Sequence, residues 1–200
     1  MRHPHRVFMC FAFLLVNGPV FAGADLQNIP LKWTPTSTVA SMGTVDLSGN
    51  IVATPIHVDT LVDTRENPAL VAENREKVGK FRQVTTSTNV AAFVTDHLKE
   101  SLHSAGLNIV DGPADITVSG EIRQFFVTEM STYKGEISIL IRVKNGAGKE
   151  LWTGAVGGDA ERFGRSYNDE NYYETISDMV LRASYHLLAN SGFRETLKAH

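Results

Sequence analysis

The sequence predicts an α+β fold in which two helices pack on one face of a mostly antiparallel sheet, as a two-layer sandwich. Two segments of the chain carry apolar residues at helical spacing, which indicates one amphipathic helix in each. Between them, the segments from residue 116 to residue 163 alternate apolar and polar residues and are separated by turn residues. Such alternation is typical of strands with one buried face, so we expect an antiparallel meander covered by the two helices.

The first helix is predicted over residues 88–105. Its apolar residues recur every three or four positions, which places them on one side of the helix: Ala91, Val94, Leu98, Leu102 and Ala105. Ser87 or Thr88 would cap the free amides of the first turn, and Gly106 suits the left-handed residue that ends many helices. The second helix is predicted over residues 170–189, with Asn168 or Asp169 as its cap.

The meander is predicted in some detail. Its first strand begins at Ile116 and loses its phase near Gln124, which predicts a bulge there. Residues 137–143 alternate cleanly, and Asn145-Gly146 is a strong hairpin signal before a partner strand over residues 151–163. Glycines within that partner strand indicate a twist, a bulge or close packing.

The chain upstream of the first helix is less regular. Residues 51–63 are predicted as a strand, because they are rich in β-branched residues, with Pro55 placing it at an edge or marking its start. Residues 64–80 are polar and contain a proline and a glycine, so we expect an exposed loop, followed by a short strand over residues 81–85 before the first helix.

Composition divides the chain into three parts. Residues 1–24 have the layout of a signal peptide, with two arginines, an apolar run and small residues, and cleavage is expected after Ala22 or Ala24. Residues 25–50 form either a tether or a pair of edge strands, and Trp33 indicates that part of this segment docks. Residues 51–200 are expected to form a single α+β domain.

The signal peptide predicts export to the periplasm. Cys10 is the only cysteine and lies within the apolar run, so the exported chain can form neither a disulfide nor a thiol site. Phe8 and Met9 precede Cys10 where a lipidation signal has small residues, so a lipid anchor is not expected. No later apolar run is long enough for a transmembrane helix.

Charge and motifs exclude several functions. Removal of residues 1–24 takes away two of 19 basic residues and none of 22 acidic ones, which leaves a net charge of −5 and no basic cluster for nucleic acid. We find no cofactor-binding or metal-binding motif. A small hydrolase using His57 with Asp59 or Asp63 is an alternative, but no nucleophile lies near them in the sequence.

Two groups of residues are candidates for binding a partner. Asp63 and Arg65 begin a loop just past a predicted strand, a usual place for a site, although an Asp–Arg pair can equally pin the loop. Phe126, Leu140 and Trp152 are expected on the open face of the sheet, as an apolar patch for a partner.

Several motifs together resemble the YajG family of bacterial envelope lipoproteins and, more distantly, the auxiliary lipoproteins of ABC-type lipid-trafficking systems. The motifs are Val62-Asp63-Thr64-Arg65, Thr86–Asn89, Ser104-Ala105-Gly106, ADITVSGEI from residue 114, and Phe163 with Tyr167 and Asn171-Tyr172. The resemblance covers residues 51–189 and implies a non-enzymatic envelope component without catalytic or ligand residues. The lipid-modified cysteine of that family has no counterpart after this signal peptide.

We therefore expect a periplasmic, non-enzymatic binding or scaffolding protein of the Gram-negative envelope. Its partner would be an envelope protein or, as the alternative function, a lipid or glycan of an envelope transport system. The sequence does not predict an oligomeric state.

Overall fold

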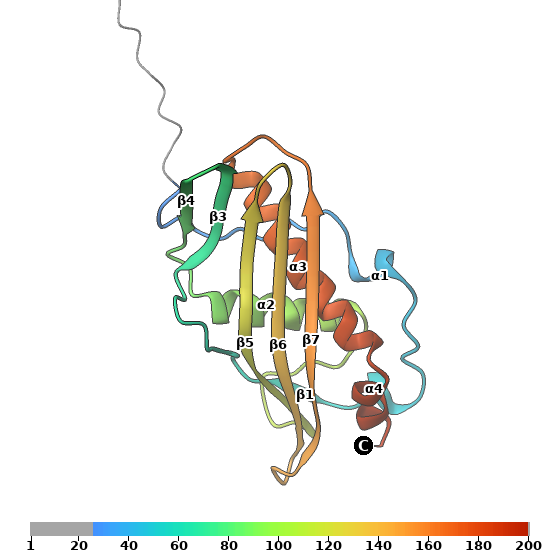
Figure 1. Cartoon of the computed structure of the whole chain (residues 1–200). Coiled ribbons are helices and arrows are strands. Elements are labelled where there is room, and N and C mark those ends of the chain that lie inside the picture. The colour runs from blue at the N-terminus through green and yellow to red at the C-terminus, as the bar shows by residue number, and fades with distance from the viewer. Residues whose placement is uncertain (1–25, 200) are drawn as a thin grey trace, which may run out of the picture.

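The computed structural model describes residues 26–199 and confirms the predicted α+β fold (Figure 1). The predicted signal peptide lies outside the described residues. The helices are α1 (Val39–Met42), α2 (Val90–Ser104), α3 (Asp169–Ala189) and α4 (Ser191–Lys198), with a 3-10 turn at Asn50–Val52. The strands are β1 (Ile56–Val58), β2 (Val62–Asp63), β3 (Leu70–Lys77), β4 (Lys80–Thr85), β5 (Ile116–Glu129), β6 (Tyr133–Asn145) and β7 (Glu150–Arg162).

The strands form one sheet with the order β4-β3-β5-β6-β7, and β1 and β2 also pair with β5. The three long strands β5, β6 and β7 are antiparallel, as the meander predicted, whereas β1, β2 and β3 each run parallel to β5. The predicted bulge is present, because the β5–β6 pairing shifts between Ile122 and Gln124.

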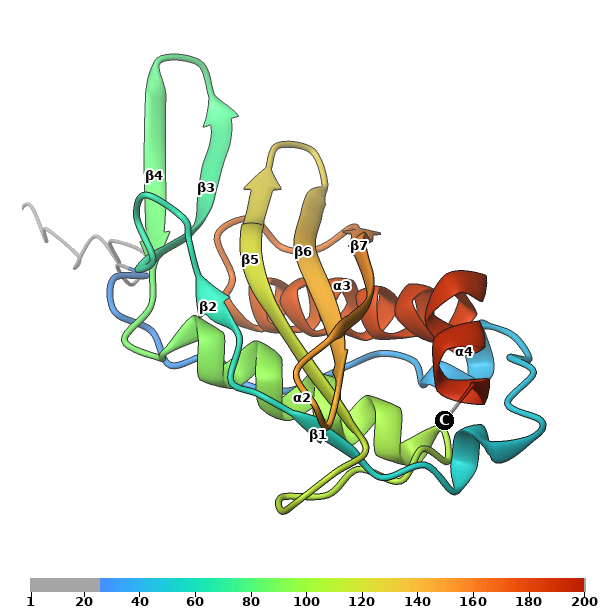
Figure 2. The same ribbon diagram turned by 90° about the horizontal axis from the view of Figure 1, so that it is seen from below.

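The loop predicted over residues 64–80 is wrong. Most of it belongs to a β-hairpin, in which β3 and β4 pair across a turn at Val78-Gly79 and Gly79 has a φ of +74°. The outer half of this hairpin projects away from the helices, with both faces in solvent (Figure 2). In a strand with both faces in solvent, apolar and polar residues need not alternate, so the pattern that predicts strands is missing here.

The strand predicted over residues 51–63 is broken into three pieces. A 3-10 turn at Asn50–Val52 comes first, β1 starts directly after Pro55, and β2 is only two residues long. Both strands pair with the first part of β5. The β-branched composition therefore predicted sheet pairing correctly but not its interruptions.

Both long helices cover the same face of the sheet. Asn89 caps α2 with its side-chain oxygen, in place of the predicted Ser87 or Thr88, and Asn168 caps α3 as expected. Below the helices lie the buried residues of the meander, which alternate along each strand: Ile116, Val118, Ile122, Phe125 and Val127 of β5, and Ile137, Ile139, Ile141 and Val143 of β6.

Helix α3 comes unusually close to β7, and glycine makes this possible. A Cβ atom added at Gly158 would lie 2.0 Å from the carbonyl oxygen of Met179 and 2.6 Å from the amide of Ala183, both in the α3 backbone. Any side chain there would push the helix away from the sheet. Gly158 therefore marks close packing, one of the predicted alternatives.

The segment before residue 50 is built into the fold rather than left as a tether. Leu26 and Ile29 pair with the end of β4, through one isolated bridge rather than a pair of strands. Trp33 stacks on His97 of α2 at 4.0 Å, and the amide of Thr34 donates to the Ser177 hydroxyl of α3 at 2.9 Å. This segment, defined here as the strap (residues 26–49), contacts both long helices.

Candidate functional site

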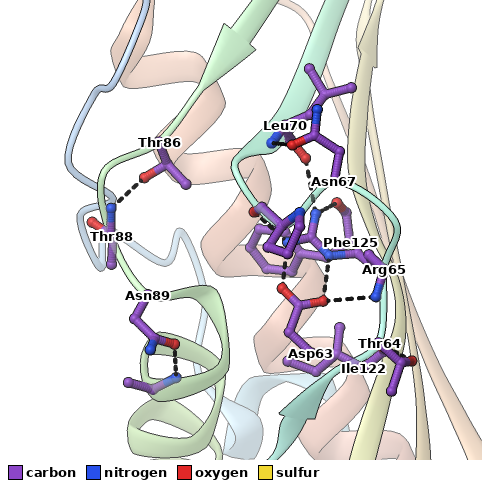
Figure 3. A network of polar contacts seen from close by, with 12 residues as sticks. Asp63, Thr64, Arg65, Asn67, Leu70, Thr86, Thr88, Asn89, Ile122 and Phe125 are labelled. Atoms are coloured by element: carbon purple, nitrogen blue, oxygen red, sulfur yellow. Dashed lines mark hydrogen bonds and ion pairs between the residues drawn. The ribbon is translucent and has the colours of Figure 1, made fainter.

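The candidate site is an open groove at the start of α2 (Figure 3). One wall is the segment from Thr60 to Ala69, which includes β2, and the other is the connection from Thr86 to Ala91, which leads from β4 into α2. The groove has a volume of about 710 Å³, within the range of ligand-binding sites.

A buried ion pair fixes the shape of the first wall. Arg65 binds both carboxylate oxygens of Asp63, at 2.9 and 2.7 Å, and the two side chains are only 9% and 10% exposed. The guanidinium also donates to three carbonyl oxygens, those of Pro68, Leu70 and Phe125, at 2.7 to 3.0 Å. These five contacts use all five N–H donors of an arginine, which leaves none for a ligand.

The geometry thus favours the pinning interpretation of Asp63 and Arg65. The pair holds the loop against β5, and the guanidinium also lies over the Phe125 ring at 5.3 Å. The motif was found by sequence reasoning, but its role is to build the groove wall.

Hydrogen bonds fix the second wall as well. The Thr86 hydroxyl donates to the carbonyl of Ile29 at 2.7 Å and accepts from the amide of Thr88 at 3.0 Å. The Thr88 hydroxyl accepts from the amide of Leu31 at 2.9 Å, so the strap supports this wall from behind. Both walls are therefore held by hydrogen bonds within the chain.

The groove surface that remains available is small and uncharged. Val62 is 58% exposed, and Ser87 is an exposed hydroxyl on the opposite wall. Asp63 is the only charged residue in the lining, and its carboxylate is neutralised by Arg65. The groove therefore suits an uncharged segment with small side chains rather than an ion.

The predicted apolar patch on the open face is not formed. Phe126 and Leu140 lie on that face and are partly exposed, but Phe126 is opposite Glu136 in the sheet and Leu140 is opposite Glu121. Ion pairs also occupy this face, such as Arg142 with Glu121 at 2.8 Å. The open face is mainly polar.

The predicted place of Trp152 is wrong. The β6–β7 register pairs Trp152 with Val143, whose side chain is buried under the helices. The indole therefore points to the helix side, where it meets the Phe193 ring of α4 edge-on at 5.9 Å. The prediction assumed that even-numbered residues of β6 and β7 lie on the same face of the sheet. The register instead pairs odd-numbered residues of β6 with even-numbered residues of β7, so Trp152 lies on the buried face.

The hydrolase alternative receives little geometric support. Nε2 of His57 lies 3.5 Å from Asp59, and Nδ1 lies 3.1 Å from the carbonyl of Val110. Asp63, the other proposed partner, is held by Arg65 instead. Within residues 26–199, no group of three or more His, Cys, Asp or Glu side chains is arranged to hold a metal ion.

A second cavity lies between the strap and the ends of α2 and α3. It has a volume of about 510 Å³, and its lining contains no charged residue. Apolar side chains form much of the wall, from Val39, Val45 and Leu47 of the strap to Ala105 and Leu188. Sequence reasoning missed this cavity because its walls come from segments far apart in the chain.

A buried carboxylate was missed as well. Glu129 is 1% exposed and accepts hydrogen bonds from the Tyr172 hydroxyl and, at 2.9 Å, from the amide of Tyr167. The Ser166 hydroxyl lies 2.7 Å from Glu129 and 2.5 Å from Glu76 of β3. Burial, and then the hydrogen bond to Glu129, raise the pKa of Tyr172. We define Glu129, Ser166, Tyr167 and Tyr172 as the Glu129 network.

The Glu129 network joins the end of β5 to the start of α3 and, through Glu76 and Asn74, to the β3–β4 hairpin. The sequence does contain a signal for this buried acid. Glu129 lies two residues after the buried Val127, so the alternation of β5 places it on the buried face. An acid in a buried position of a strand requires such partners.

Comparisons with known proteins agree with this architecture. Residues 51–179 match a family model described as uncharacterized lipoprotein. Protein XCC0632 from Xanthomonas campestris has a similar fold, with a TM-score of 0.56 at 9% identity over 87% of this chain and 95% of its own. The hypothetical protein CT253 from Chlamydia trachomatis gives 0.51 at 14% identity, over 74% of this chain and 99% of its own. At these identities the likeness concerns the fold alone.

No curated protein matches the chain significantly. In the part of the chain that the structure describes, no helix has the length and apolar character needed to cross a membrane.

Proposed function

This chain belongs to the uncharacterized lipoprotein family, and we propose that it is a non-enzymatic binding and scaffolding protein of the bacterial cell envelope. In this proposal, the groove at the start of α2 holds an uncharged segment of an envelope protein. The groove is lined by residues 60–63, 68, 69 and 86–91.

The observation that carries the proposal is the Asp63–Arg65 pair beside the groove. A bidentate pair with every guanidinium donor satisfied holds the loop in one shape before any ligand arrives. Binding sites gain affinity when their walls are ordered in advance, because less entropy is lost on binding. The same arrangement commits Asp63 and Arg65 to each other and to backbone carbonyls, so neither is a free acid or base at the groove.

The experiment is cross-linking in cells, with a photo-reactive residue at Ser87 and, as a control, at His103 on the far end of α2. Both positions are exposed. We expect a reproducible envelope protein attached at residue 87 only. A Val62→Glu variant should abolish the adduct, whereas Val52→Glu, at another exposed valine, should not. Equal adducts at both positions, or none at residue 87, would contradict the groove as the binding site.

The periplasmic location and a YajG-like assignment are parts of the same proposal. The family description speaks for a lipid anchor, whereas Cys10 lacks the small preceding residues of a lipidation signal. Mass spectrometry of the exported chain distinguishes the two. We expect an unmodified chain that starts at Gly23 or Asp25, and an acylated chain that starts at Cys10 would contradict this part.

The uncharged cavity favours a second candidate function, the binding of a lipid as an accessory of envelope transport. Its apolar walls suit an acyl chain. We expect lipid extracted from the purified protein to fall in an Ala105→Trp variant, which fills the cavity, and to be unchanged in Ala189→Trp, at an exposed alanine. Absence of lipid from the wild-type protein would remove this candidate.

A further inference from the structure

Apolar side chains gather at one end of the sheet. Among the described residues, six large apolar side chains are exposed, and four of them lie at this end. Val78 is at the tip of the β3–β4 hairpin, Phe81 is on β4, Met130 is in the β5–β6 turn, and Phe163 follows β7. Their exposed fractions are 101%, 62%, 58% and 82%. We define these four residues as the apolar rim.

The sheet register brings the rim together. Asn74 of β3 pairs with Glu129 of β5, which pairs with Tyr133 of β6, which in turn pairs with Arg162 of β7. Met130 and Phe163 therefore follow directly after this row of paired residues, and Val78 lies four residues beyond it, at the hairpin tip. Figure 1 shows the hairpin tip, the β5–β6 turn and the end of β7 at one end of the sheet, and Figure 2 shows the hairpin and the β5–β6 turn projecting to the same side, away from the helices.

Two lysines flank the hairpin tip at an energetic cost. Lys77 and Lys80 are paired directly opposite each other in the β3–β4 ladder, on either side of Val78-Gly79. Both are exposed, and neither has an ion-pair partner in residues 26–199. Like charges directly across a sheet are destabilising, so an anion between them would stabilise this arrangement.

The hairpin is positively charged on an acidic protein. Residues 73–82 carry Arg75, Lys77, Lys80 and Arg82 against Glu73 and Glu76, whereas the whole chain has a net charge of −3. Glu73 is paired with Arg75, and Glu76 contacts Ser166 of the Glu129 network. Arg82 lies over the Tyr167 ring at 3.2 Å, so the two lysines beside the apolar tip are the charges that remain for a partner.

Exposed apolar side chains with lysines around them fit the surface of an anionic membrane. The apolar tips enter the boundary between headgroups and acyl chains, and the lysines meet the lipid phosphates. We infer that the apolar rim and Lys77/Lys80 dock this protein on anionic lipid headgroups, independently of the groove at the start of α2. A groove or pocket is not needed for this contact, because the rim consists of projecting turns.

The test is flotation of the purified exported chain with vesicles of phosphatidylethanolamine that contain either phosphatidylglycerol or phosphatidylcholine. We expect binding to the phosphatidylglycerol vesicles only, and weaker binding at high salt. In a Lys77→Glu/Lys80→Glu variant, loss of two lysine contributions should weaken binding about 30-fold or more.

The matched control is Lys144→Glu/Lys149→Glu at the β6–β7 turn, where two exposed lysines lie at the opposite end of the sheet. It changes the net charge equally and should retain binding. A Val78→Trp variant should show blue-shifted tryptophan fluorescence on anionic vesicles, in contrast to Val62→Trp in the groove. Equal losses in the two charge variants would overturn the inference. So would failure of the wild-type chain to bind, which would leave an acidic protein as the occupant of the rim.

Discussion

Two hairpins of this molecule are held in place by different forces. The β6–β7 hairpin lies against α3, with one face covered by apolar side chains and by the contact at Gly158. The β3–β4 hairpin is buried only at its root, at Val71, Ala72 and Val84, and its outer half projects beyond the helices. Polar groups also anchor it: Arg65 binds the carbonyl of Leu70 at its start, and Ser166 contacts Asn74 and Glu76 farther along. A covered hairpin is fixed by the core, and the uncovered half of the other needs specific polar anchors.

This difference matters for function. The covered hairpin contributes to stability and presents a polar outer face, whereas the uncovered one presents apolar and basic side chains that do nothing for the core. Side chains that cost stability are expected where a surface binds something. The following predictions test whether the two hairpins are in fact held so differently.

The largest effect is expected at the root of the uncovered hairpin. Arg65→Met removes the partner of a buried carboxylate and should lower the free energy of unfolding by about 4 kcal/mol. Chemical denaturation measures this loss. The double variant Asp63→Ala/Arg65→Met should be less destabilised than Arg65→Met, because no unpaired charge remains buried. If the loss in the double variant equalled the sum of the losses in Asp63→Ala and Arg65→Met, the ion pair would not be the anchor.

A slightly smaller effect is expected in the covered hairpin. Gly158→Ala places a methyl group 2.0 Å from the Met179 carbonyl, so the helix must shift, at a cost of about 3 kcal/mol. Gly157→Ala is the control on the next residue. Its methyl group would lie 3.5 Å from the nearest atom, on the exposed face, and its effect on thermal unfolding should be minor. Equal effects at the two glycines would disprove the close contact.

The Glu129 network should give a pH signature. Tyr172→Phe removes a hydrogen bond to a buried carboxylate and should cost about 2 kcal/mol at neutral pH. Because the pKa of Tyr172 is raised in the folded protein, the unfolded chain loses that proton first as the pH rises above about 10. The wild-type protein should therefore lose stability at alkaline pH more steeply than Tyr172→Phe. If the free energy of unfolding fell equally with pH in the two proteins, the pKa of Tyr172 would not be raised by folding.

The smallest effect has the opposite sign. Lys77→Glu replaces a like-charged pair across β3 and β4 with an opposite pair and should raise the free energy of unfolding by about 0.5 kcal/mol. The increase should vanish at high salt, since both side chains are exposed. Lys144→Glu serves as the control for net charge. A loss of stability in Lys77→Glu would mean that the two lysines do not repel each other.

The elements that could be predicted from the sequence are those with one face in the core. Alternation in β5 and β6, the bulge beside Gln124 and the helical spacing of Ala91, Val94 and Leu98 all follow from one covered face, and all are present. Strand β3 was missed because neither face of the outer half of its hairpin is covered. Trp152 was placed on the wrong face because register between strands depends on the turn, which no single strand reveals.

The candidate site was predictable only in part. The motif at Asp63 and Arg65 was visible, with pinning as one of its interpretations. The groove, the uncharged cavity and the Glu129 network combine segments distant in the chain. Local pattern shows which residues are polar or apolar, but not which of them meet.

The strap has a consequence for how this protein folds. Its residues bond to α3 and to the connection just before it: Leu26 to the Tyr167 hydroxyl, Thr34 to Ser177 and Thr36 to Asp178. During synthesis Leu26, Thr34 and Thr36 are made long before the partner residues in and beside α3, so their hydrogen bonds form late. Contacts so distant in sequence slow folding, because a long loop has to close first. The finished fold therefore cannot form on a nascent chain that still lacks α3, and folding is completed only after translation has passed it.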